Sequence, residues 1–149
     1  MRTLMMIATL AVACPAGALA TESAATYFPS RDVTQAFRVG RPLVEVDDYK
    51  IHASRRTEAG MGEVHTLDTD IIYVLDGTAT FVTGGVLVGA RQTAPNEIRG
   101  ASIDGGETRT LAKGDIVTVP RGVPHWFKSV DAPFLYYVVK VSGGEGGAM

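Results

Sequence analysis

GDIVTVPRGVPH, residues 114–125, is the part of the sequence that most clearly indicates the architecture. Asp115 to Val119 is rich in β-branched residues, which is typical of a strand. We expect this strand to end at the turn Pro120 to Gly122, because Pro cannot donate to a sheet ladder and Gly tolerates a positive φ. The chain then re-enters the sheet at His125. A histidine therefore stands at the start of a strand, directly after a turn.

Short runs of β-branched and aromatic residues, separated by Gly, Asp and Pro, lie on both sides of this stretch. Such a pattern is typical of an antiparallel barrel or sandwich, so an all-β fold is expected. Asp76-Gly77 and Gly84-Gly85 are predicted to be two-residue hairpin turns. Residues 91–106 are polar and glycine-rich, and we expect a long surface loop or an excursion there that joins the two halves of the barrel. The predicted strands are residues 43–46, 49–55, 63–67, 70–75, 78–83, 86–88, 108–111, 115–119, 125–130 and 134–141.

Residues 1–20 have the features of a signal peptide. Met1 to Thr3 carries a positive charge, an apolar run follows as far as Cys14, and Ala18-Leu19-Ala20 suits signal peptidase. We predict cleavage after Ala20 and a periplasmic or secreted protein. The apolar run is too short to span a bilayer, so no membrane association is expected after cleavage. The one cysteine lies in this segment, so any metal must bind to the mature chain through nitrogen and oxygen.

The mature chain is expected to be a single domain with short ends. Ser30 to Val33 can cap a helix that runs to about Arg38, before Gly40 and Pro42 end it. The last residues are rich in glycine and have nothing to bury. The resulting division is an N-terminal arm, a β-barrel and a flexible tail, at residues 21–42, 43–141 and 142–149.

Composition narrows the possible partners. The chain has 149 residues, 46% of them hydrophobic, which is enough for one packed core. Its formal net charge is −2 and its charged residues are interspersed, so neither a nucleic-acid footprint nor a patch for anionic lipid is indicated. A small molecule is therefore the expected partner.

Residues 114–129 resemble the second motif of the cupin superfamily, G-x5-P-x-G-x2-H-x3-N, except that Ser129 replaces the final Asn. The first motif, G-x5-H-x-H-x3,4-E-x6-G, is present in altered form. When the chain is aligned on Gly77, Asp70 falls on its acidic position, His65 on its second histidine and Glu63 on its first. The resemblance covers residues 43–141. It implies a single-domain jelly-roll β-barrel that holds one divalent metal ion.

The ligand types fit this implication. Alternate residues of a strand share a face, so Glu63 and His65 point the same way. With Asp70 and His125 they provide two nitrogen and up to two oxygen ligands, which suit Mn, Fe, Ni, Zn or Cu. We predict a metal site at His65, Asp70 and His125, with Glu63 as a possible fourth ligand.

Glu63 has three possible roles on this reasoning. It can ligate the metal, it can act beside the metal as a catalytic general base, or it can form a salt bridge with Arg55 or Arg56. Candidate substrate-binding residues are His52, Tyr73 and Phe127. The competing interpretation is a solvated or core position for His52 and core packing for the two aromatic residues.

Cupins include dioxygenases, isomerases, decarboxylases, lyases, sensors and storage proteins, so the resemblance does not choose a reaction. The first hypothesis is a metal-dependent enzyme, of the oxygenase or the lyase/isomerase type, acting on a small organic molecule. The second is a non-catalytic periplasmic cupin that binds a small molecule. The third is a purely structural dimer. Exposed strand edges and apolar residues 134–141 favour a homodimer in any of these cases.

Overall fold

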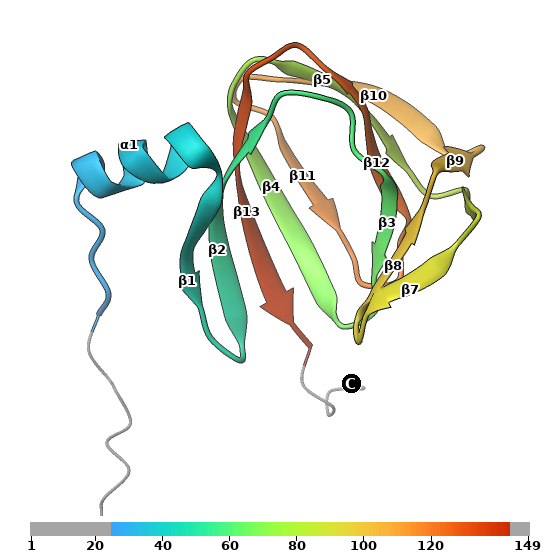
Figure 1. Cartoon of the computed structure of the whole chain (residues 1–149), viewed down its shortest axis with the longest axis horizontal. Helices are drawn as coiled ribbons and strands as arrows, with labels where there is room; N and C mark the ends of the chain where they lie inside the picture. The colour runs from blue at the N-terminus through green and yellow to red at the C-terminus, as the bar shows by residue number, and fades with distance from the viewer. Residues whose placement is uncertain (1–24, 144–149) are drawn as a thin grey trace, which may run out of the picture.

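The computed structural model describes residues 25–143, and these form two facing β-sheets with one helix (Figure 1). One sheet has the strand order β1-β2-β13-β4-β11 and the other β10-β5-β12-β3-β8-β7, while β6 and β9 form a small separate pair. The elements are α1 Ser30–Val39, β1 Arg41–Glu45, β2 Tyr49–Arg56, β3 Gly62–His65, β4 Asp68–Asp76, β5 Thr78–Thr83, β6 Val86–Val88, β7 Arg91–Ala94, β8 Glu97–Gly100, β9 Ser102–Asp104, β10 Glu107–Ala112, β11 Ile116–Val119, β12 His125–Val130 and β13 Phe134–Ser142.

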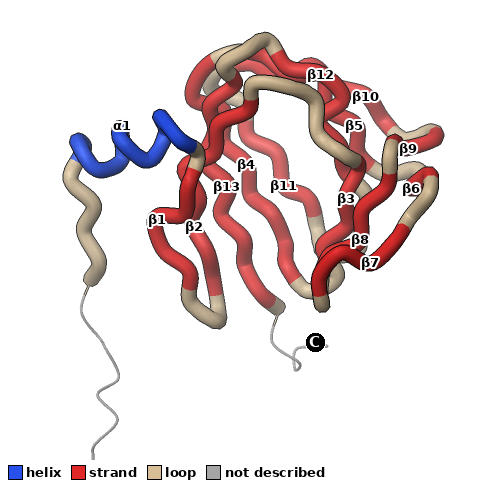
Figure 2. The backbone as a smooth tube through the Cα atoms, in the orientation of Figure 1, coloured by secondary structure: helices blue, strands red, loops and turns tan. Residues whose placement is uncertain are grey.

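All paired strands are antiparallel, which confirms the predicted all-β class. Figure 2 shows the five-stranded sheet facing β3, β8 and β7 of the other sheet, as in a barrel. The strands predicted at residues 78–83, 86–88 and 125–130 have the predicted bounds. Short runs of β-branched and aromatic residues bounded by turn residues therefore located these strands well.

The surface loop predicted at residues 91–106 is wrong. This segment contains β7, β8 and β9, and β8 pairs with β3. Gly100 in β8 marks close packing rather than a loop, because a Cβ there would lie 2.7 Å from the carbonyl oxygen of Val88. Gly in a strand often indicates such a close backbone approach, which composition alone does not distinguish from a turn.

The two predicted hairpins are also corrected. Gly77, Gly84 and Gly85 do have positive φ angles of 80°, 76° and 73°. However, β4 and β5, which flank Gly77, belong to different sheets, and β6 pairs with β9 instead of β5. Turn chemistry predicted the change of direction, whereas strand pairing depends on the rest of the chain.

The predicted N-terminal helix is α1, and it packs on the sheet. Its cap residue is Pro29 and no side chain caps it, so the predicted capping role of Ser30 is wrong. At the other end Gly40 adopts a left-handed conformation and its N–H donates to the Ala36 carbonyl at 2.9 Å. Ala36 is fully buried, and the rings of Phe37 and Tyr137 pack edge to face with their centroids 4.9 Å apart. The helix of the predicted arm is therefore packed against the barrel.

Several predictions concern the chain ends. The signal peptide, its cleavage after Ala20 and Cys14 lie outside the described residues. At the other end, β13 continues to Ser142 and the Gly143 N–H donates to the Leu67 carbonyl at 3.0 Å. The first two residues of the predicted flexible tail are thus part of the fold, and residues 144–149 lie outside the described range. Within residues 25–143, no helix combines the length and apolar character needed to cross a bilayer.

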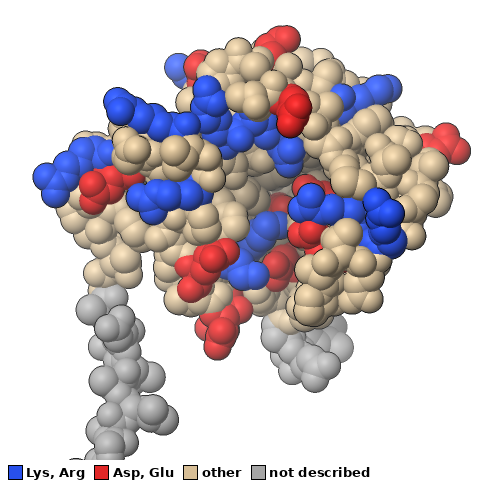
Figure 3. All heavy atoms as spheres, in the orientation of Figure 1, with Lys and Arg blue, Asp and Glu red and all other residues tan. Residues whose placement is uncertain are grey.

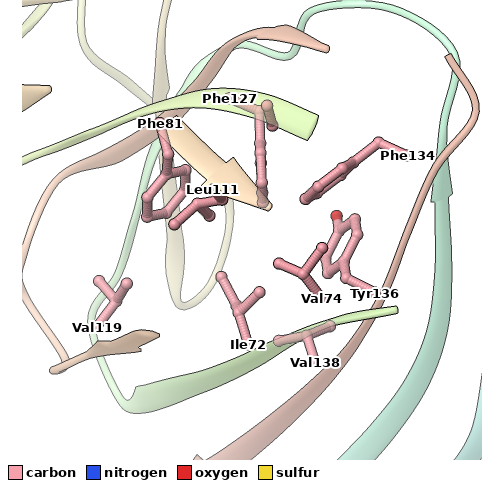
Figure 4. Packing of buried hydrophobic residues seen from close by; sticks show 10 residues of the cluster. Ile72, Val74, Phe81, Leu111, Val119, Phe127, Phe134, Tyr136 and Val138 are labelled. Atoms are coloured by element: carbon pink, nitrogen blue, oxygen red, sulfur yellow. The ribbon is translucent and has the colours of Figure 1, made fainter. Parts of the chain in front are cut away.

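The hydrophobic core fills one part of the space between the sheets (Figure 4). Its rings pack closely, with centroids of Phe81 and Phe127 4.6 Å apart and of Phe127 and Tyr136 5.1 Å apart. The core consists of Ile72, Val74, Ala79, Phe81, Leu111, Val119, Phe127, Phe134, Tyr136 and Val138.

Three core strands become polar on the same inward face. Asp70 stands two residues before Ile72 on β4, and His125 stands two residues before Phe127 on β12. On β13, Lys140 follows Val138 by two residues. Because strand side chains alternate with a period of two, each polar group points inward beside the core. The apolar core therefore supports a polar chamber at one end of the barrel.

Candidate metal centre

Four ionisable side chains with metal-binding chemistry meet in this chamber. Glu63 and His65 alternate on β3, Asp70 lies on β4, and His125 begins β12 directly opposite Glu63. Asp70 and the two histidines are buried, with relative exposures of 4% for Asp70, 8% for His65 and 2% for His125. One ligand atom from each of Glu63, His65 and His125 lies within 4.8 Å of the other two.

The distances within this group suit a shared ion. The Nε2 atom of His125 lies 3.7 Å from Oε1 of Glu63 and 3.8 Å from Oδ2 of Asp70. The Nε2 atom of His65 lies 3.5 Å from the same Asp70 oxygen. Two ligands that are each about 2.1 Å from an ion lie roughly 3.4 Å apart at a tetrahedral angle. A transition metal therefore needs only small side-chain adjustments to bind here.

The orientation of His125 also fits a metal ligand. Its Nδ1 atom lies 3.3 Å from the carbonyl oxygen of Val123. A carbonyl only accepts, so Nδ1 carries the proton in this contact and Nε2 presents its lone pair to the chamber. A second ring nitrogen held by a carbonyl is the usual arrangement around metal-binding histidines. Burial lowers the pKa of the His125 imidazole, which keeps it neutral and able to bind a cation.

The two carboxylates of the predicted ligand set differ in their partners. Lys140 Nζ donates to both oxygens of Asp70, at 2.8 and 2.9 Å. Glu63 has looser contacts, with Arg56 Nη2 at 3.7 Å and Arg99 Nη2 at 3.4 Å. Of the three roles that sequence left open for Glu63, the structure thus shows a contact with Arg56 and a position among possible metal ligands. Asp70, by contrast, is already neutralised by an ammonium group.

The chamber opens to solvent as a cavity of about 240 Å³. Figure 3 shows a hollow on this face of the molecule, with basic and acidic side chains around it. The cavity is lined by His52, Ser54, Arg56, Glu63, His65, Asp70, Ile72, Glu97, Arg99, His125, Phe127, Tyr136, Val138 and Lys140.

Arg56 is held in place on the cavity wall. Its Nε donates to the Tyr136 hydroxyl at 2.9 Å, and its guanidinium carbon lies 4.5 Å from the centre of the Phe127 ring. Burial raises the pKa of the Tyr136 hydroxyl, so this group stays protonated and accepts the Arg56 hydrogen bond. The guanidinium group is thus fixed by two aromatic residues of the core.

Glu97 and Arg99 form a second charged pair at the cavity. Arg99 Nε donates to Glu97 Oε1 at 2.5 Å. Burial alone would raise the pKa of Glu97, but the hydrogen bond and the charge of Arg99 outweigh it and lower that pKa. The Arg99 pKa is raised by the same contact. Both residues therefore remain ionised and paired.

The three residues predicted to bind substrate occupy different places. Phe127 lines the cavity from within the core. His52 lines it as well, with Nε2 3.0 Å from Oε1 of Glu45. Tyr73 lies between Ile72 and Val74, whose side chains are buried, so its ring is on the outer face and 44% exposed. The structure does not bring Tyr73 to the site.

Sequence reasoning missed several polar residues of the chamber. Lys140 was not among the predicted site residues, but it reaches inward to Asp70. Arg99 and Glu97 fell in the supposed loop, and Tyr136 was not among the candidate residues. The period-two pattern of β13, in which Lys140 follows Val138 on the inward face, was the available signal for Lys140.

Residues 50–145 match the sequence profile of the family described as Cupin. This chain is a cupin. No curated protein matches it. The fold of this cupin is similar to that of a protein from Bacillus halodurans, with a TM-score of 0.56 and 14% identity over 87% of this chain and 89% of that one.

Two further solved structures resemble this cupin. An uncharacterised protein with a double-stranded β-helix domain from Klebsiella pneumoniae has a TM-score of 0.52 and 21% identity, covering 85% of this chain and 91% of that one. A protein of unknown function from Streptococcus pyogenes has a TM-score of 0.51 and 20% identity, covering 71% and 75%. At these identities the likeness shows the shared fold.

Proposed function

We propose that this cupin is a metal-dependent enzyme of the lyase or isomerase type that acts on a small organic molecule. The observation that carries the proposal is the convergence of a Glu63 oxygen with the nitrogens of His65 and His125 beside a solvent-open cavity. Two histidines and one carboxylate leave open positions on a bound transition metal. A divalent ion at this position supplies a Lewis acid that polarises a carbonyl or hydroxyl oxygen of the substrate.

Glu63 is assigned here as a ligand. Its Oε1 atom faces His125, while Oε2 faces Arg99. In this orientation Oε1, whose contact with Arg56 is 3.7 Å long, remains available to an ion, and Oε2 faces the Arg99 guanidinium group. Of the three roles considered from sequence, ligation is the one that is consistent with both contacts: Oε1 faces the ion position, and Arg99 orients the carboxylate through Oε2.

The polar lining favours proton transfer over oxygen chemistry. Lys140 places its ammonium group at the cavity wall, where the contact with Asp70 holds it. His52 lines the same cavity, and its imidazole ring carries both a hydrogen-bond donor and an acceptor in the neutral form. Positioned acid and base groups of this kind are what a lyase or isomerase reaction requires.

The first test is metal content. Protein purified without chelator, and loaded separately with Mn, Fe, Ni, Zn or Cu, is analysed for metal and crystallised for anomalous diffraction. About one equivalent, with an anomalous peak between Glu63, His65 and His125, supports the site. Protein that binds none of these ions overturns the enzyme proposal as stated.

The second test concerns the reaction type. Small hydroxy and carbonyl compounds are incubated with the loaded protein in D2O and followed by NMR. Metal-dependent loss of a C–H signal or elimination supports lyase or isomerase chemistry. Oxygen consumption without exchange would instead favour an oxygenase, and tight binding without turnover would favour the non-catalytic binding cupin.

The cellular location and the homodimer remain proposals. A periplasmic or secreted location is supported by the charge and apolar pattern of residues 1–20. Fractionation with mass spectrometry of the N-terminus tests it, since an exported chain beginning at Thr21 is expected and a cytoplasmic chain beginning at Met1 would contradict it. Light scattering of the purified protein tests the dimer.

A further inference from the structure

We infer that the small molecule taken up by the cavity carries a carboxylate group, and that Arg56 is the residue that binds it. The inference rests on the metal site proposed above, because it follows from the charge of the cavity with an ion present. It assigns Arg56 a role in specificity that is separate from the three ligands of the cluster.

The charges that line the cavity balance before any ion enters. Three basic side chains and three acidic side chains face it, and the histidines are counted as neutral. A divalent cation therefore changes the net charge of the lined cavity from zero to +2. An uncompensated charge among largely buried side chains is costly, so an anionic ligand is favoured there over a neutral one. The six charged residues are Arg56, Arg99, Lys140, Glu63, Asp70 and Glu97.

Two of the three cations already have close partners. Lys140 donates to both oxygens of Asp70, and Arg99 donates to Glu97. Arg56 differs: among the described residues, its one carboxylate neighbour within 4.0 Å is Glu63, at 3.7 Å. This separation is too long for a hydrogen bond. Arg56 is therefore the cation with the weakest contact to a carboxylate among these three.

Metal binding weakens the contact between Arg56 and Glu63 further. Glu63 Oε1 is the atom that contacts Arg56, and the same atom faces His125 and the ion position. An ion bound there partly neutralises the Glu63 carboxylate, which then compensates less of the charge of Arg56. The Arg56 side chain is only 25% exposed, so water compensates it incompletely. A carboxylate group on the ligand supplies the negative charge that compensates Arg56.

Arg56 is also preorganised for this task. Its Nε is bonded to the Tyr136 hydroxyl and its guanidinium lies over the Phe127 ring, which fixes its position. Its terminal nitrogens are left for a planar carboxylate, which matches the guanidinium fork. The cavity lining comes from strands and includes no helix N-terminus, so the backbone anion site that commonly holds a phosphate is absent from this lining. The volume of about 240 Å³ limits the ligand to a small molecule.

Malonate is a suitable probe, with its uncharged diamide, malonamide, as the matched control. Protein loaded with Mn(II) is first analysed for metal and then titrated with each compound by calorimetry. Malonate should bind at least about tenfold more tightly than malonamide. Arg56→Gln should keep its metal and weaken malonate binding about tenfold or more, and Arg56→Lys should lose less. Arg109→Gln, a charge change outside this cavity, should match the wild type.

The outcomes separate this inference from the proposed function. If no metal binds, both fail. If metal binds but malonate and malonamide bind alike, or Arg56→Gln leaves malonate affinity unchanged, the carboxylate assignment alone is overturned. Inorganic phosphate is titrated in parallel, and tighter binding of phosphate than of malonate also overturns it. Circular dichroism of Arg56→Gln shows whether the variant is folded, and Arg56→Lys provides the comparison if it is not.

Discussion

Lys140 and Asp70 stand directly opposite each other on β13 and β4, and the lysine ammonium contacts both carboxylate oxygens at 2.8 and 2.9 Å. The pair is largely buried, with side-chain exposures of 15% and 5%. It neutralises one of the two acids in the predicted ligand set. Glu63, which has only looser ionic contacts, is the acid more available to a cation.

Lys140→Met should lower the free energy of unfolding by about 3 kcal/mol, because it leaves the Asp70 carboxylate buried without its counter-charge. Adding Asp70→Asn should recover much of this loss. Urea denaturation of the single and double variants measures both effects. Lys113→Met, an exposed position, should stay within about 0.5 kcal/mol of the wild type. A Lys140 variant as stable as the Lys113 control would show that the pair contributes little.

The same variant tests whether Asp70 ligates metal. If it does, a bound ion replaces the lost ammonium, and metal should stabilise Lys140→Met more than it stabilises the wild type. Thermal unfolding with and without metal provides the comparison. Equal stabilisation of both proteins would argue that Asp70 serves only as the partner of Lys140.

His125→Ala should reduce bound metal from about one equivalent to near zero, since it removes a buried nitrogen that faces the cluster. His52→Ala is the matched control, because His52 lines the cavity outside the cluster and its loss should leave the metal in place. Elemental analysis of both variants decides the point. Equal metal content in His125→Ala and the wild type would refute the site.

Glu63→Gln should weaken metal binding by more than about tenfold, because mutation even of residues that only hydrogen-bond to the metal ligands typically has an effect of that size. The change keeps the shape of the side chain and removes its charge. Competition with a fluorescent chelator measures the affinity, with Glu97→Gln as a control for a nearby carboxylate outside the cluster. Unaltered affinity combined with lost turnover would assign Glu63 as a general base instead.

The metal-free protein should lose stability as the pH falls below about 6.5. Burial lowers the pKa of His125 in the folded state, so the unfolded chain binds a proton at a higher pH than the folded chain. Stability therefore rises with pH between the lowered pKa and the ordinary value, and is complete above it. Denaturation at pH 5, 6 and 7.5 of the wild type and His125→Gln tests this. The same slope in both proteins would exclude His125 as the cause.

Phe81→Ala should lower the free energy of unfolding by about 3 to 5 kcal/mol, because the fully buried ring packs against Phe127 and leaves a cavity when removed. Tyr73→Ala should cost less than about 1 kcal/mol, since the ring is on the outer face. Chemical denaturation compares them. Equal losses would contradict the placement of Tyr73.

Local pattern was enough to predict much of this protein. The runs of β-branched and aromatic residues at 78–83 and 125–130 predicted two strands with their observed bounds, because such residues favour the extended backbone and fit a pleated surface. The spacing around Pro120, Gly122 and His125 led to the cupin resemblance, and residues 50–145 match that family. Glu63, His65 and His125 were named from the same motifs and do meet in space.

What local pattern could not supply was the choice of partners across the sheets. Asp70 and Lys140 are 70 positions apart, and only the register of β13 on β4 brings them opposite each other. Glu63 and Arg99 meet in the same way through β3 and β8, a pairing hidden in a segment whose composition indicated a loop. Short-range sequence specifies strands, turns and ligand types, because those depend on neighbouring residues. The ionic partners that make Asp70 and Glu63 different depend on long-range pairing, which arises when the whole chain packs.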